Sequence, residues 1–538
     1  MSFLQRLIDD GLVARIWKRD TRVFSPATAD DEKAIANRLG WLDAPDGMGA
    51  HLAGLQAFVD QQRRDGLTDV YLLGMGGSSL CAEVLRETAP AGLRGVSLVV
   101  LDTTDERAVN RAASTLVPSK ALFLVASKSG GTIEVSALER FFGSLMTRAL
   151  GDRAGAHFVA ITDPGTALGD LARERGYRHT FINPADIGGR YSALSLFGLV
   201  PAALLGLDVN AFLAAAISMA ARCRTATADN PGLALGAFMA EQAKAGRDKL
   251  TILLPDPLAP LGLWIEQLVA ESTGKRGHGV LPVVDEPRPD DVAAYGPDRA
   301  FVVVDTGQND ATKRTIDALG GAGHPVFRVA AENLGAEFFR WEFATAVAGA
   351  ALGVNPFDEP NVRDAKRRTQ DLLDAAKAAG TLPVAPPLAP LAGVEGVRVR
   401  EHRAPWPDAG RYVAFLDYLP ADAARAGTLD ELRARIRQRA ALATTRGLGP
   451  RYLHSTGQYH KGGPDTGLFV LLTSADETTT PVPGTDYSFS TLKQAQALGD
   501  FAALEAANRS VIHLHFDNSS PDITRAITHV LRQHGLVD

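Results

Sequence analysis

Short, nearly continuous apolar runs separated by longer amphipathic segments constrain the fold of this chain more than any other feature. Most of these runs are followed within two residues by Gly, Ser, Asp or Pro, and the first of them cover residues 70–73, 97–102, 121–126, 158–162 and 180–182. Continuous apolar runs are typical of strands that a parallel sheet buries on both faces, and helices supply the crossovers between such strands. The pattern predicts a doubly wound α/β unit over about residues 40–210.

The same alternation returns further along the chain. Strands are expected near residues 251–254, 280–284, 300–305 and 326–329, and residues 338–353 are expected to form a long buried helix. These segments predict a second doubly wound α/β unit.

A proline-rich segment at residues 381–396 is interpreted as a linker or an extended crossing segment. Beyond it, further apolar runs alternate with helical stretches, at residues 412–419, 468–472 and 511–516. A chain of 538 residues is too long for a single core. We therefore predict an α/β protein with an N-terminal helical arm, two doubly wound parallel-sheet domains and a C-terminal α/β region, at residues 1–40, 41–215, 216–380 and 381–538.

Composition excludes several classes of protein. The net charge is −6 and no long basic run occurs, so nucleic acid and membranes are not expected partners. Residues 1–22 lack the apolar core of a signal peptide, and no uncharged apolar run approaches the ~20 residues that span a bilayer. The two cysteines, Cys81 and Cys223, form no Cys-x-x-Cys motif, which argues against a disulfide framework or a structural zinc site. We expect a cytoplasmic protein without a bound metal.

Two predicted strand-to-helix turns carry groups suited to an anion. The glycine-rich turn at residues 74–79 contains Gly77 and Ser78. The turn at residues 127–132 supplies hydroxyl groups and a lysine, from Ser127, Lys128, Ser129 and Thr132. Backbone N–H groups at a helix N-terminus, together with such side chains, suit a phosphomonoester. A ligand-free tight turn and a helix-capping cluster are the alternatives, but two such turns at one sheet edge favour phosphate binding.

A carboxylate and a guanidinium are candidates for the chemistry. Glu271 stands in an apolar helical segment that begins near Leu263 and breaks at Gly274. Burial of this carboxylate would raise its pKa toward neutrality, which suits a general base; an ordinary exposed helix glutamate is the alternative. Arg190 lies in a Gly-Gly-Arg-Tyr-Ser segment at residues 188–192, where it could hold a substrate oxygen or a developing enediolate, or form a structural salt bridge.

A lysine and two histidines complete the candidates. Lys366 follows a rigid, proline-containing turn at residues 355–362. His454 and His460 lie in a glycine-bounded loop at residues 454–463, and either could supply an acid or base near neutral pH or simply be solvated. A further pair, His513 and His515, has no third metal ligand in view and is interpreted as structural.

Together and in this order, these motifs resemble the phosphoglucose isomerase family. The matching segments are the glycine-rich turn, the serine/threonine loop, the Gly-Gly-Arg-Tyr-Ser segment, the Gln-Leu-x-x-Glu-Ser-x-Gly-Lys segment and the Asn-x-Phe-Asp turn with its following lysine, at residues 74–78, 127–132, 188–192, 267–275 and 355–366. More closely, the chain looks like the isomerase half of bacterial transaldolase–phosphoglucose isomerase fusions, here without the transaldolase half. The resemblance implies that both predicted domains are of the sugar-isomerase (SIS) type.

The resemblance also implies roles for individual residues. Glu271 would move a proton between C1 and C2, Arg190 would steady the enediolate and Lys366 would help to open the sugar ring. The substrate would be bound by Gly77, Ser78, Ser127, Lys128, Ser129, Thr132 and Gln267. The family's ring-opening histidine lies in a Gly-Gln-His context upstream of the lysine motif and has no counterpart there. The nearest match is the downstream Gly-Gln-Tyr-His segment, so His460 is the first choice and His454 the second.

The implied activity is the interconversion of glucose 6-phosphate and fructose 6-phosphate through an enediol, without a cofactor. One alternative keeps the chemistry but changes the anionic hexose, for example to sulfoquinovose; another is a non-catalytic sugar-phosphate sensor. The family usually works as a dimer with a shared active site, so we expect a homodimer. Association with a separate transaldolase is left open.

Overall fold

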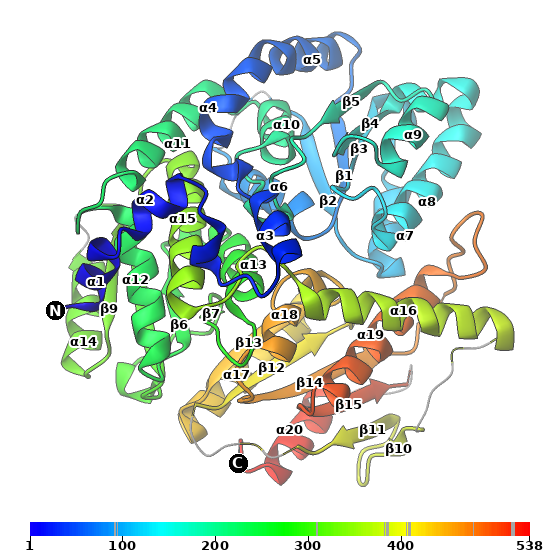
Figure 1. The fold of residues 1–538 in the computed structure, drawn as a ribbon. Helices are drawn as coiled ribbons and strands as arrows, with labels where there is room; N and C mark the ends of the chain where they lie inside the picture. The colour runs from blue at the N-terminus through cyan, green and yellow to red at the C-terminus, as the bar shows by residue number, and fades with distance from the viewer. Residues whose placement is uncertain are drawn as a thin grey trace.

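The computed structural model describes the whole chain except residues 91–92, 94, 308–309, 381, 383–386, 405, 407–409, 477 and 518–521. Its described strands form three sheets that follow one another along the chain, each accompanied by helices (Figure 1). The predicted α/β class is confirmed.

The first sheet is parallel throughout, with the strand order β2-β1-β3-β4-β5. Its strands are β1 (Asp69–Leu73), β2 (Ser97–Leu101), β3 (Ala121–Ala126), β4 (Phe158–Thr162) and β5 (His179–Ile182). The helices of this unit are α5 (Leu52–Arg64), α6 (Leu80–Thr88), α7 (Glu106–Ser114), α8 (Ile133–Leu150), α9 (Ala167–Glu174) and α10 (Leu196–Leu205). Every residue of the central strand β3 is buried, which explains why its sequence is apolar without alternation. Each predicted strand forms within one residue of its expected bounds.

The second sheet is also parallel, with the order β7-β6-β8-β9. Its strands are β6 (Lys249–Leu253), β7 (Leu281–Val283), β8 (Arg299–Asp305) and β9 (Val326–Ala330), and its helices are α11 (Val209–Cys223), α12 (Pro231–Lys244), α13 (Leu261–Thr273), α14 (Asp310–Gly321) and α15 (Leu334–Leu352). The helix α15 is the predicted long buried helix. The Asn333 side chain caps its start, and Gly353 ends it in the left-handed region at φ +76°.

The third sheet has the order β10-β11-β15-β14-β12-β13. Strands β12 to β15 are parallel, whereas β11 runs antiparallel to β15, and β10 antiparallel to β11. The strands are β10 (Ala389–Pro390), β11 (Val397–His402), β12 (Tyr412–Asp417), β13 (Ala443–Leu448), β14 (Gly467–Ser474) and β15 (Ser510–Phe516), and the helices are α17 (Ala423–Ala440), α18 (Gly457–Gly462), α19 (Phe489–Ala506) and α20 (Ile523–Gln533). Part of the predicted proline-rich linker, residues 381 and 383–386, lies outside the described residues, and β10 falls within the rest of it.

One long helix ties the second unit to the third. Helix α16 (Pro360–Ala379) begins with Pro360 in its first turn, ends at the left-handed Gly380 and packs along α19 (Figure 1). At the other end of the chain lie α1 (Phe3–Asp9), α2 (Leu12–Trp17), α3 (Ala29–Ala36) and α4 (Ala44–Gly47). The Trp17 ring stacks on Phe339 and Phe343 of α15, so the N-terminal helices pack against the second unit.

No helix in the described part of the chain is long and apolar enough to cross a membrane. The domain boundaries given above remain an interpretation of the sequence.

Candidate active site

Two glycine turns touch at the centre of the site. They are η4 (Gly76–Ser78), after β1, and η7 (Gly189–Tyr191). A Cβ atom added at Gly77 would lie 1.9 Å from the carbonyl oxygen of Gly189, so only glycine permits this approach. The Ser192 hydroxyl donates to the carbonyl oxygens of Gly77 and Gly189, at 3.3 and 2.6 Å. The glycine-rich turn and the arginine segment are thereby held together.

Glu271 lies on α13, is only 6% exposed and has its carboxylate close to two polar side chains. Its Oε1 lies 3.1 Å from Nη1 of Arg190, and its Oε2 accepts a hydrogen bond from Nε2 of Gln267 at 3.1 Å. Burial raises the pKa of Glu271, and the neighbouring Arg190 offsets part of that rise. A desolvated carboxylate with a raised pKa can accept and return a proton near neutral pH.

The Arg190 guanidinium joins three segments of the chain. Its Nε donates to the Ser272 hydroxyl at 2.9 Å, and its Nη2 donates to the carbonyl oxygens of Pro356 and Asp358 at 2.8 and 2.7 Å. Burial lowers the pKa of Arg190, but the carboxylates around it, Glu271 first, more than offset this, so the net shift is upward. The guanidinium therefore remains a fixed positive charge beside Glu271.

His454 is coupled to this pair through Gln267. The amide nitrogen of Gln267 donates to the backbone carbonyl of His454 at 2.6 Å as well as to Glu271. The Nε2 atom of His454 lies 2.9 Å from Oε1 of Glu134, which also accepts from Gln496 at 2.7 Å. Burial alone would raise the pKa of Glu134, but His454 reverses this and the pKa is lowered. Glu134 is therefore a carboxylate that orients the imidazole.

A cavity of about 140 Å³ lies beside this histidine. Its wall is formed by the start of α8, the start of α16 and the 3-10 turn η10 (Arg451–His454). The lining residues are Gly131, Thr132, Ile133, Glu134, Val362, Ala365, Lys366, Thr369, Gln370, Leu453, His454 and Gln496. The end of the predicted hydroxyl loop at Thr132, the lysine Lys366 and the second-choice histidine His454 therefore face one space.

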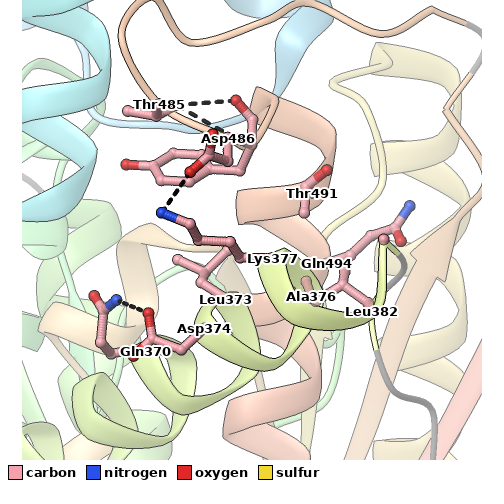
Figure 2. A pocket seen from close by; sticks show the side chains of 12 residues that line it. Gln370, Leu373, Asp374, Ala376, Lys377, Leu382, Thr485, Asp486, Thr491 and Gln494 are labelled. Atoms are coloured by element: carbon pink, nitrogen blue, oxygen red, sulfur yellow. Dashed lines mark hydrogen bonds and ion pairs between the residues drawn. The ribbon is translucent and has the colours of Figure 1, made fainter.

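A larger groove of about 550 Å³ continues along α16 toward the segment that precedes α19, and Figure 2 shows its walls. Gln370 borders both spaces. The ion pair between Lys377 and Asp486, at 2.8 Å, crosses the groove, and both side chains are more than half exposed. Glu134 and His454 line the smaller cavity, and Gln267 joins the His454 backbone to the buried Glu271–Arg190 pair, which itself is not part of the lining. We take the smaller cavity and this pair as the candidate active site.

Comparison with known proteins identifies the family of the chain. A sequence model of the family described as "Phosphoglucose isomerase" matches residues 59–280. The chain is 31% identical to a glucose-6-phosphate isomerase of Rubrobacter xylanophilus over 373 residues, which are 59% of this chain and 85% of that protein. This chain belongs to the phosphoglucose isomerase family. It is also 34% identical to the Prochlorococcus marinus glucose-6-phosphate isomerase, but over 39% of this chain and 41% of that protein.

Two solved structures share the fold of this isomerase-family chain. A hypothetical protein of Thermus thermophilus superposes with a TM-score of 0.58 and 24% identity, covering 68% of this chain and 97% of that one. A glucose-6-phosphate isomerase of Chlamydia trachomatis gives a TM-score of 0.51 at 19% identity, covering 61% of this chain and 74% of that one.

The predicted phosphate loop is only partly turned toward the cavity. Thr132 lines it, and the Ser127 hydroxyl lies 3.1 Å from the Thr132 hydroxyl. Ser129 accepts a hydrogen bond from the Gly131 N–H at 3.3 Å. Lys128 does not line the cavity, because its ammonium group is paired with Asp163 and donates to the carbonyl of Ala185 at 3.0 Å. The positive charge expected from Lys128 is therefore neutralised locally.

The two histidines are placed very differently. His460 lies in α18, is 2% exposed, and has its Nδ1 3.0 Å from the Tyr412 hydroxyl. Its ring packs against Phe469 of the third sheet, and burial lowers its pKa well below the usual value. This environment is that of a structural core residue. His454, the second choice from the sequence, is the histidine that lies beside the cavity.

Sequence reasoning missed Glu134 and Gln496. Glu134 comes two residues after the hydroxyl loop, in the first turn of α8, where an acidic residue is ordinary. Its burial, and the approach of His454 from the third unit, depend on tertiary structure alone.

Proposed function

We propose that this chain interconverts glucose 6-phosphate and fructose 6-phosphate, as its isomerase relatives are named to do, without a cofactor. The observation that carries the proposal is the buried Glu271–Arg190 pair, joined through Gln267 to the His454–Glu134 pair beside a cavity that also holds Lys366. One pair is suited to move a proton between carbons, and the other to open a sugar ring.

The first step is opening of the ring. His454 gives a proton to the ring oxygen while the C1 hydroxyl loses its own to solvent water, and Glu134 holds the imidazole in position for this transfer. Lys366 lies on the same cavity and stabilises negative charge on the sugar oxygens. The product is an open-chain aldose.

The second step moves a proton from C2 to C1. Glu271 removes the C2 proton, which leaves a cis-enediolate. The O2 hydroxyl proton passes to O1, and Glu271 returns its proton to C1 on the same face, which gives the 2-ketose. The raised pKa of Glu271 makes its carboxylate a stronger base than an exposed glutamate. Arg190 stands 3.1 Å from this carboxylate and stabilises the enediolate charge.

The phosphate end of the substrate is assigned to the hydroxyl loop. Ser127 and Thr132 provide hydroxyl groups at the N-terminus of α8, where backbone N–H groups also favour an anion. Gly77 and Ser78 contribute the neighbouring turn. At the sugar end of the substrate, Gln267 is a candidate contact. Its Oε1 atom is buried without a hydrogen-bond partner among the described residues, so it can accept a hydrogen bond from a sugar hydroxyl.

A coupled assay tests this function. Fructose 6-phosphate is supplied, and the glucose 6-phosphate formed is followed by its dehydrogenase; glucose 6-phosphate is followed in reverse. We expect turnover in both directions and none with 6-sulfonated hexoses. Turnover of the sulfonated sugars alone would move the assignment to another anionic hexose, and binding of both phosphates without turnover would make the chain a sensor.

We also propose that the protein acts in the cytoplasm as a homodimer. Cys81 and Cys223 are both buried and unpaired, as suits a reducing compartment. The resemblance to a family of dimers supports the assembly, and sedimentation equilibrium tests it: a fully active monomer would refute it. Association with a separate transaldolase is tested in the same experiment by adding that enzyme.

A further inference from the structure

A second cavity lies behind the turn that carries His454. It has a volume of about 630 Å³ and is bounded by the carboxyl ends of β2, β7, β12 and β13 and by the starts of α7 and α17. Leu453 and His454 face the candidate active site, whereas Arg451, Tyr452 and Ser455 line the second cavity. The η10 turn is therefore a thin wall between two spaces.

Much of the second cavity is apolar. Val100, Leu263, Val284 and Leu419 come from all three units and form its hydrophobic walls. A volume of this size lies within the ~300–1,000 Å³ usual for small-molecule sites, and carboxyl ends of parallel strands are where α/β proteins bind ligands. The space is thus suited to an apolar or aromatic body.

The carboxylates around the cavity are already engaged. Asp102 and Asp417 pair with Arg451 and Arg446, at 2.7 and 2.8 Å. The remaining carboxylates are held by basic partners or by a helix end: Asp105 by Lys493, Asp285 by Arg433, and Asp422 by the backbone N–H groups at the start of α17. Burial raises the pKa of Glu266 to about 8, so this side chain is uncharged at neutral pH.

One guanidinium on the wall, that of Arg425, has the carboxylates of Asp417 and Asp422 nearby but lacks hydrogen bonds of this kind. The Nε and Nη2 atoms of Arg425 are buried and make no hydrogen bond within the described part of the chain. A buried, unpaired donor set of this kind is costly, and an anion would satisfy it. Arg425 therefore offers donors on this wall that a ligand anion could fill.

We propose that this cavity is a second small-molecule site, which takes an organic anion with one carboxylate, phosphate or sulfonate group and an apolar or aromatic body. Arg425 binds the anionic group, and the apolar walls bind the body. Glu266 and Ser455, whose side chains are hydrogen-bonded at 3.2 Å, provide a further polar contact beside the η10 turn.

Occupation of the site inhibits the isomerase, a consequence that rests on the proposed function. The active-site cavity of about 140 Å³ is smaller than the usual ~300 Å³ lower bound for ligand pockets, so it must widen to admit a sugar phosphate. The space behind η10 gives the His454 turn room to retreat. A ligand that fills this space holds the turn forward.

The test uses 8-anilinonaphthalene-1-sulfonate, a fluorescent aromatic anion, as the probe. It is titrated against the whole protein without a sugar phosphate, because bound substrate would move η10 into the second cavity. We expect one saturable site in the wild type. Arg425→Met should weaken it at least about tenfold, because a charge-assisted hydrogen bond is lost, and Ala108→Phe should block it by filling the cavity from α7. Arg439→Met, an exposed arginine on the same helix, should bind like the wild type.

Binding that survives both Arg425→Met and Ala108→Phe would overturn the proposed site. The inhibition is measured separately as the KM for fructose 6-phosphate, because substrate and probe compete for the space into which η10 moves. The probe should raise this KM in the wild type and in Arg439→Met but not in Arg425→Met. Probe binding with an unchanged KM would refute the coupling to η10, and a chain without isomerase activity would still report binding.

Discussion

At the scale of single residues, the two histidines give the sharpest contrast. His454→Ala should lower turnover of cyclic glucose 6-phosphate about 10²–10⁴-fold, the usual effect of losing an acid–base group, while an open-chain substrate is still isomerised. His460→Ala removes a buried ring that is hydrogen-bonded to Tyr412. Its main effect should be a lower melting temperature, with a smaller effect on the rate of ring opening. Steady-state rates and melting temperatures of both variants decide between them. The opposite pattern would return the role to His460.

The role of Arg190 depends on its planar, many-donor shape. Arg190→Lys keeps the positive charge near Glu271 but cannot reproduce the bonds to Ser272, Pro356 and Asp358. We expect kcat to fall by more than KM rises, because the enediolate charge exists only along the reaction. A change confined to KM would make Arg190 a contact of the bound substrate rather than of the intermediate.

The sequence drew attention to Glu271 because it stands in an apolar helical segment, where it could be a buried base or an ordinary exposed glutamate, and the resemblance to the isomerase family favoured the base. It could not rank the histidines, since both lie in the same glycine-bounded loop and their difference arises from what folds over each. Glu134 was missed for the same reason: its partner His454 is 320 residues away in the chain. Lys128 was expected at the phosphate, but Asp163 neutralises it in the structure.

At the scale of elements, the parallel strands were predictable because both of their faces are covered. Strands β11 and β13 were not predicted from the sequence. β11 alternates charged and apolar residues and lies antiparallel near the edge of its sheet, and β13 contains two Thr and one Gly among its six residues. The formation of such strands depends on pairing with neighbouring strands rather than on a continuous apolar run in the sequence.

The loop between β3 and α8 can be tested as a unit. Ser127→Ala combined with Thr132→Ala should raise KM for fructose 6-phosphate far more than it weakens binding of unphosphorylated fructose. Each charge-assisted hydrogen bond contributes roughly 1.5–3 kcal/mol. Thr147→Ala, an exposed position on α8, is the matched control. Equal losses for phosphorylated and free sugars would mean that these hydroxyl groups only cap the helix.

At the scale of the whole molecule, the three units meet around buried charges, and Glu266 makes their stability depend on pH. Its pKa is raised to about 8 by burial, so the native state keeps a proton that the unfolded chain loses above its ordinary pKa near 4.5. The free energy of unfolding should therefore fall as pH rises between these values, by at most about 1.4 kcal/mol per pH unit from this group. Glu266→Gln should remove that part of the slope, as denaturant unfolding at pH 5 to 8.5 can show. An unchanged slope would mean that Glu266 is ionised in the folded protein.

The central claim is that Glu271 carries a proton between two carbons of a sugar phosphate. The most direct measurement follows deuterium from solvent into C2 of glucose 6-phosphate, by NMR, in the wild type and in Glu271→Gln. We expect the wild type to incorporate deuterium as it isomerises. The variant should lose both exchange and isomerisation by about 10²–10⁴-fold while it still binds the sugar phosphate, because the amide keeps the shape and loses the base. Retention of more than about a tenth of the wild-type rate in the variant would contradict the account.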